Sequence, residues 1–225
     1  MTVRFLVTAG PTREYLDPVR FISNPSSGRM GYAVAEAALR AGGRVTLVSG
    51  PVALVPPAGV RLIEVETAEE MRRAVRDEAA GADVVVMAAA VADYRPARRS
   101  RRKLKKGPSS LSVRMVRTPD ILAELGRRRG KALLVGFAAE TGDPAREAAR
   151  KLAQKGLDLV IGNDVSRRGS GFGSGFNEAV FVGRNGECER LPRMRKERLA
   201  RLIVRRCLAL RGSGAGGRTR TGTPA

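Results

Sequence analysis

Short apolar runs alternate with amphipathic stretches along most of this chain. Nearly continuous apolar runs, which are typical of strands buried on both faces, occur at 3–8, 44–49, 83–89, 132–138 and 157–161, with a shorter one at 61–65. Helical patterns lie between them at 32–41, 67–80, 118–129 and 143–155. The alternation predicts an α/β fold, a mainly parallel Rossmann-like sheet with helices on both faces.

Capping and turn residues mark the starts of several predicted helices and one hairpin. Thr67 and Glu70 form a capping-box pattern, and Asp143-Pro144 is a helix start. Thr118-Pro119-Asp120 also predicts a helix start, with Thr118 as the N-cap residue. Near the C-terminus, Asn185-Gly186 lies between the segments 179–182 and 187–191, which predicts a hairpin.

The remaining segments complete one domain, 1–211, which is followed by a tail. Residues 111–116 alternate like a half-exposed strand, and 193–210 follow as a final helix. A basic, low-apolar stretch at about 95–110 is expected to be a flexible flap, and the glycine-rich segment 169–175 a connector. The small and polar residues 212–225 are expected to be disordered.

An unusually long connection, Gly10 to Ser27, precedes the first helix. Loops between a strand and its helix usually have about two to six residues, so this one is expected to bind a ligand. At its end, Ser26, Ser27 and Gly28 leave backbone N–H groups uncovered beside the positive end of the helix dipole, where a phosphate is favoured. Plain helix capping without a ligand is the alternative.

Composition excludes several classes of chemistry. The chain has no histidine, and Cys188 and Cys207 stand alone, which argues against a disulfide framework, a zinc site and a His-activated nucleophile. No apolar run spans a bilayer and no secretory signal is present, so a cytoplasmic protein without membrane contact is expected. The net charge of +20 favours polyanionic partners, but the arginines are scattered and aromatic residues make up only 4%, which favours small anionic substrates over nucleic acid.

Two other functions remain open on these patterns. An NAD(P)-dependent short-chain reductase would suit the topology, but the first loop lacks GxGxxG and the second strand ends in Ser49-Gly50-Pro51, without an acid for the ribose. A basic nucleic-acid-binding module would use 98–106, and would bind in a salt-sensitive way.

Several motifs together resemble the bacterial phosphopantothenate-cysteine ligase family. They occur in order along about 3–210: TAGPTRE (8–14), DPVRFISN (17–24), SSGRMG (26–31), AAAVADY (88–94), KLKK (103–106), GFAAET (136–141) and NDV (163–165). The resemblance implies a ligase that joins L-cysteine to 4′-phosphopantothenate through an acyl-cytidylate made from CTP, in coenzyme A biosynthesis. It also implies Mg²⁺ with CTP, a homodimer and a possible flavin-dependent decarboxylase partner. The metal ligands, and the choice of CTP over ATP, stay open.

The resemblance also assigns site residues. It implies catalytic roles for Asn24, beside the acyl-cytidylate, and Lys103, on the flap. It implies that the substrate phosphate is held by Arg20, with substrate contacts from Ser26, Ser27, Gly28 and Ala90. It implies CTP contacts, shared with Lys103, for Ala89, Asp93, Thr118, Pro119, Asp120, Ile121, Phe137, Lys151 and Lys155. Each assignment has an alternative without a ligand. Arg20 would be a surface arginine, Lys103 part of a solvated basic loop, Thr118 to Ile121 a helix cap, and Phe137 a core aromatic.

Overall fold

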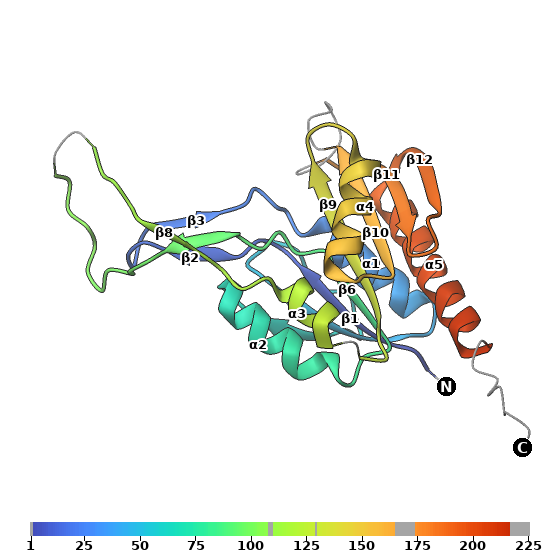
Figure 1. Ribbon diagram of the computed structural model, residues 1–225. Helices are drawn as coiled ribbons and strands as arrows, with labels where there is room; N and C mark the ends of the chain where they lie inside the picture. The colour runs from blue at the N-terminus through green and yellow to red at the C-terminus, as the bar shows by residue number, and fades with distance from the viewer. Residues whose placement is uncertain (1, 108–109, 129, 165–173, 217–225) are drawn as a thin grey trace, which may run out of the picture.

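A mainly parallel sheet of eight strands forms the centre of the computed structural model, which describes residues 2–107, 110–128, 130–164 and 174–216 (Figure 1). Its spatial order is β12-β11-β10-β9-β6-β1-β4-β5. The strands in chain order are β1 Arg4–Ala9, β4 Arg44–Ser49, β5 Arg61–Glu64, β6 Val84–Met87, β9 Leu133–Glu140, β10 Leu159–Asp164, β11 Phe176–Gly183 and β12 Cys188–Arg195. The first six are parallel to one another, β11 pairs antiparallel with β10, and β12 pairs antiparallel with β11.

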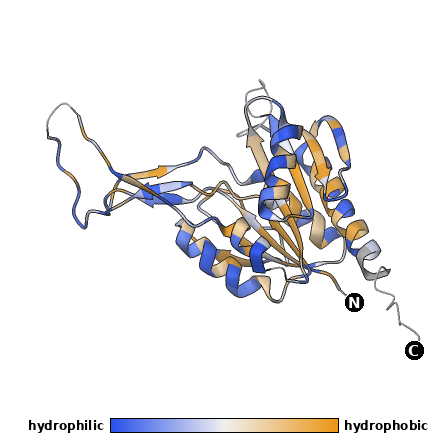
Figure 2. Ribbon diagram, in the orientation of Figure 1, coloured by the Kyte–Doolittle hydropathy of each residue, from blue (hydrophilic) through white to orange (hydrophobic). Residues whose placement is uncertain are grey.

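Helices cover both faces of the sheet. On one face, α1 (Arg29–Arg40) and α5 (Lys196–Gly216) pack on a core that includes Phe5 and Val7. On the other face, α2 (Ala68–Ala79), α3 (Ile121–Arg128) and α4 (Pro144–Lys155) pack on a core that includes Leu6. Alternate residues of β1 therefore enter different cores, as the pleat of a strand requires. Figure 2 shows apolar strands between helices whose outer faces are polar.

The architecture confirms the fold class expected from the sequence. All four residues of β6 are buried, which is why this strand reads as a continuous apolar run. The Asn185-Gly186 hairpin is also confirmed: it joins β11 and β12, and Gly186 has a φ of 83°, which favours glycine. The final helix runs on to Gly216, so it includes the first residues of the expected tail. The rest of that tail and most of the expected connector 169–175 lie outside the described residues.

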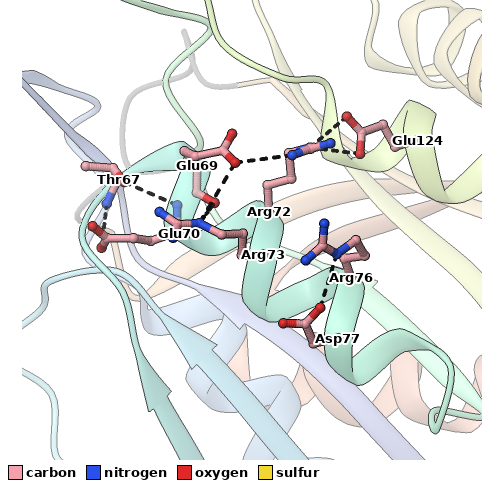
Figure 3. Close-up of polar contacts among 8 residues, drawn as sticks. All are labelled: Thr67, Glu69, Glu70, Arg72, Arg73, Arg76, Asp77 and Glu124. Atoms are coloured by element: carbon pink, nitrogen blue, oxygen red, sulfur yellow. Dashed lines mark hydrogen bonds and ion pairs between the residues drawn. The ribbon is translucent and has the colours of Figure 1, made fainter.

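The helix starts agree with two of three expectations. Thr67 caps α2 and Glu70 returns the bond, a complete capping box that Figure 3 shows. Asp143 caps α4, with Pro144 in its first turn. The expectation for Thr118 was wrong, because its hydroxyl donates to the carbonyl of Ala92 at 2.5 Å, and the N–H of Ala123 is capped by Asp120 instead.

An arm projects from the sheet where the long first loop and the flap lie side by side (Figure 1). It contains two small antiparallel pairs, β2 (Arg13–Tyr15) with β3 (Phe21–Ser23), and β7 (Tyr94–Pro96) with β8 (Met115–Arg117). The expected strand at 111–116 is thus shorter and shifted to β8. None of the helices in the described ranges is long and apolar enough to cross a membrane.

Candidate anion-binding site at the carboxyl edge of the sheet

A cavity of about 690 Å³ opens at the carboxyl edge of the parallel strands. The chain connections diverge here, because β1 is followed in the sheet by β4 on one side and β6 on the other. Open α/β sheets bind ligands at such a switch point. The walls come from the loop before α1, the segment after β6, the start of α3, and the ends of β9 and β10.

The start of α1 forms one wall. Gly28 precedes the helix with a φ of 75°, no side chain caps this end, and the first turn holds no acidic residue. Gly31 lets the helix approach β1 closely, since a Cβ at this position would lie 2.5 Å from that of Ala9 and 2.7 Å from the carbonyl oxygen of Thr8. The exposed N–H groups and the positive end of the helix dipole therefore face the cavity without a protein anion on them.

Asn24 links this loop to the segment after β6. Its side-chain amide nitrogen donates to the carbonyl oxygens of Ala90 at 3.1 Å and Val91 at 3.2 Å. With both amide hydrogens committed in this way, the side-chain oxygen is the atom through which Asn24 can contact a ligand.

A cationic wall lies opposite, on α4. Lys151 donates from Nζ to the carbonyl oxygen of Phe137 at 2.5 Å, and Lys155 pairs with Asp120 at 2.9 Å. Burial would raise the pKa of Asp120, but the hydrogen bonds from Lys155 and from the N–H of Ala123 outweigh it and lower that pKa. Asp120 is therefore ionised at neutral pH, and it offsets part of the positive charge of this wall.

The structure brings together fourteen of the sixteen predicted site residues. These residues all line the cavity: Asn24, Ser26, Ser27, Gly28, Ala89, Ala90, Asp93, Thr118, Pro119, Asp120, Ile121, Phe137, Lys151 and Lys155. The two that do not line it, Arg20 and Lys103, belong to the arm.

Arg20 contacts a protein carboxylate instead of the cavity. Its Nη2 donates to Asp17 at 2.6 Å and to the carbonyl of Leu104 at 2.7 Å, and Leu104 in turn donates its N–H to Asp17. The hydrogen bond from Arg20 is the main reason why the pKa of Asp17 is well below its usual value. In this structure Arg20 fastens the flap to the first loop, and Lys103, the residue before Leu104, is exposed.

Other polar residues of the cavity had no role assigned from the sequence. Asn163, Asn177 and Lys196 are buried, and Arg29 and Arg117 are more exposed. Asn163 lies in one of the family motifs, which was the available signal. The described residues contain no group of three His, Cys, Asp or Glu side chains that could hold a metal ion.

Comparison with known proteins identifies the family. Residues 1–210 match the family described as "DNA/pantothenate metabolism flavoprotein C-terminal domain". The chain belongs to this family. It is 45% identical over 206 residues to the coenzyme A biosynthesis bifunctional protein CoaBC of Bacillus subtilis, covering 91% of this chain and 51% of that protein. The CoaBC of Escherichia coli K12 is 44% identical, covering 90% and 50%.

A solved structure agrees with these matches. The crystal structure of the C-terminal domain of CoaBC has a TM-score of 0.80 and 41% identity, and the match covers 95% of this chain and 99% of that one. The curated CoaBC relatives are longer proteins, and this chain spans about half of their length. In those relatives two functions reside in one protein, so the expected separate decarboxylase partner is not supported. The expected homodimer stays a prediction.

The family description contradicts two expectations that came from the resemblance. It names a flavoprotein, for which FMN is the implied cofactor in place of Mg²⁺ with CTP. The same description contradicts the expected function of a CTP-dependent ligase. What the comparisons support is the coarser statement, a family of coenzyme A biosynthesis enzymes.

The cavity fits one part of FMN and not the other. The start of α1 suits the phosphate of that cofactor. The lining does not suit the flavin ring system in the same way. Its aromatic side chains are Tyr94 and Phe137, which come from separate elements, and Tyr94 is 48% exposed. The polar lining consists of amides, hydroxyls and cations. These residues fit a phosphate and do not form a slot for a flavin ring.

Proposed function

We propose that this chain binds a phosphorylated, pantothenate-derived substrate in the cavity, as part of an enzyme of coenzyme A biosynthesis. The observation that carries the proposal is the uncapped start of α1 at Gly28, which opens into the cavity at the switch point of the sheet. The family description and the CoaBC relatives support pantothenate metabolism as the source of the ligand.

The charge around the cavity suits this ligand. A phosphate carries nearly two negative charges at neutral pH and three acceptor oxygens. The N–H groups at the start of α1 are fixed donors, and Ser26 and Ser27 add hydroxyls beside them. Hydrogen bonds of this charge-assisted kind contribute roughly 1.5–3 kcal/mol each, which is enough to make the phosphate the main determinant of affinity.

The other walls would orient the remainder of the substrate. Asn24 presents its side-chain oxygen between α1 and the segment after β6, where it can accept a hydrogen bond from an amide or hydroxyl. Lys151 and Lys155 place positive charge on the far wall, partly balanced by Asp120. Arg20 fastens the flap through Asp17 and Leu104 and therefore acts on the loop that leads to the cavity.

Calorimetric titration of the full chain with 4′-phosphopantothenate and with pantothenate tests this function, because the two compounds differ only in the phosphate. We expect the phosphorylated compound to bind at least about tenfold more tightly, as one charge-assisted hydrogen bond requires. Equal affinities would overturn the proposal. FMN in a parallel titration provides the comparison: tight binding with a change in the flavin absorption spectrum would replace the proposed ligand with the flavin that the family description implies.

A further inference from the structure

The segment after β6, residues 89–93, provides one wall of the cavity, although it lies outside the regular helices and strands. Its one ladder contact is an isolated bridge between Ala90 and Pro11. Backbone N–H and C=O groups that are buried outside regular structure need partners from elsewhere in the chain. The side chains that supply those partners therefore decide where this wall lies.

Thr12, a buried residue of the first loop, contacts this segment twice. Its Oγ1 accepts a hydrogen bond from the N–H of Ala92 at 2.9 Å, and its own N–H donates to the carbonyl oxygen of Ala90 at 3.4 Å. The carbonyl oxygen of Thr12 accepts from the hydroxyl of Ser23 at 2.8 Å, one residue before Asn24. Thr12 thus joins the wall after β6 to the strand that leads to Asn24.

Asn24 depends on the same carbonyl groups. Its side-chain amide donates to the carbonyl oxygens of Ala90 and Val91, so the Ala90 oxygen accepts from both Asn24 and the N–H of Thr12. A carbonyl oxygen has two lone pairs, and both are used here. A displacement of residues 90–92 would therefore move the Asn24 amide, and with it the side-chain oxygen that can contact a ligand.

The buried carboxylate of Glu14 orients the hydroxyl of Thr12. Glu14 is 4% exposed and accepts a hydrogen bond from the N–H of Ala68, the first residue of α2, at 2.8 Å. Burial raises the pKa of Glu14, and hydrogen bonds from the Ala68 N–H and the Thr12 side chain oppose that rise. A hydroxyl that donates to Glu14 keeps its lone pairs for the N–H of Ala92.

We propose that Thr12 is a positioning residue of the cavity, which holds residues 90–92 where Asn24 can bind the part of the ligand that carries no phosphate. This inference rests on the proposed function and deepens it. Thr12 does not line the cavity itself, so its effect passes through the Ala90 and Val91 carbonyl groups to Asn24. Pantothenate and 4′-phosphopantothenate share the part concerned, so loss of the Thr12 hydroxyl lowers both affinities and leaves their ratio unchanged.

Thr12→Val removes the hydroxyl and keeps the shape of the side chain, whereas Thr12→Ser keeps the hydroxyl. In calorimetric titrations of the full chain, Thr12→Val should weaken the binding of pantothenate and of 4′-phosphopantothenate about tenfold each, the equivalent of one hydrogen bond to the ligand. Thr12→Ser should bind both compounds nearly as the wild type does. Thr46→Val is the matched control in β4, away from the cavity lining, and should alter neither affinity.

Amide hydrogen exchange provides a readout that needs no ligand. In Thr12→Val the N–H of Ala92 loses its acceptor, so its exchange should accelerate relative to that of Val86 in β6, whereas a loss of overall stability would accelerate both. Thr12→Ser should restore the protection of Ala92. Ser23→Ala removes the other link between Thr12 and Asn24, and it should lower both affinities even where Thr12→Val folds poorly.

The outcomes separate this inference from the proposed function. Unchanged protection of Ala92 in Thr12→Val, or lost protection with both affinities intact, would overturn the role of Thr12 and leave the proposed function in place. A wild-type protein that binds pantothenate and 4′-phosphopantothenate equally would refute the proposed function, while a parallel fall of both affinities in Thr12→Val would still support the role of Thr12.

Discussion

Replacing Gly31 by alanine tests whether the close approach of α1 to β1 builds the anion-binding wall. The added Cβ would meet the Cβ of Ala9 at 2.5 Å and the carbonyl oxygen of Thr8 at 2.7 Å, neither of which can move without the strand. Alanine favours a helix by up to about 1 kcal/mol over glycine. Overpacking in a tight core costs typically about 1–3 kcal/mol, and contacts this short with strand atoms favour the upper part, about 2–3 kcal/mol, so we expect a net loss of about 1–2 kcal/mol.

Thermal unfolding and calorimetry measure the two consequences. A loss of that size lowers the melting temperature by roughly 2–8 °C for a domain of this length. Because the helix start must move, the affinity for 4′-phosphopantothenate should also fall, while that for pantothenate changes little. Gly81→Ala is the matched control, since the nearest atom to its added Cβ is the carbonyl oxygen of Glu78 at 3.6 Å. Unchanged stability and phosphate affinity in Gly31→Ala would refute this reasoning.

Three further predictions concern individual contacts. Thr67→Ala removes the capping box of α2 (Figure 3) and should lower the free energy of unfolding by about 0.5–2 kcal/mol in chemical denaturation, whereas Thr67→Ser should restore most of it. Because Arg20 lowers the pKa of Asp17, the ionised Asp17 carboxylate stabilises the fold above about pH 4, and this stabilisation is lost as the pH falls further. The difference in free energy of unfolding between the wild type and Asp17→Asn should therefore become smaller between about pH 6 and pH 2. A difference that stays constant over this range would contradict the prediction. Lys155→Gln should raise the pKa of Asp120 in an NMR titration, and an unmoved pKa would show that the pair contributes nothing.

Much of the sheet could be predicted because its strands are buried on both faces. The apolar runs at β1, β4 and β6 have no polar alternation to obscure them, and strong caps at Thr67 and Asp143 mark two helix starts. The arm could not be predicted in the same way. Its strands have three residues each and are partly exposed, so neither length nor periodicity signals them.

The candidate site residues fall into the same two groups, those that follow buried strands and those on the arm. Residues that follow the buried strands, such as Asn24 after the first loop and Asp93 after β6, meet in the cavity because parallel strands end at one edge. Arg20 and Lys103 lie on the arm, whose position no strand pattern fixes, and the structure keeps them out of the cavity lining. Lys196 was missed because a lysine at a helix start resembles any surface cation until the antiparallel turn of β11 and β12 brings it to the cavity.

A crystal structure of the full chain with bound 4′-phosphopantothenate tests the central claim most directly, because phosphorus density locates the anion without reference to any variant. The account predicts the phosphate at the start of α1, within hydrogen-bond distance of the N–H groups that follow Gly28. A phosphate held on the arm by Arg20 or Lys103, with the start of α1 free of ligand, would contradict it.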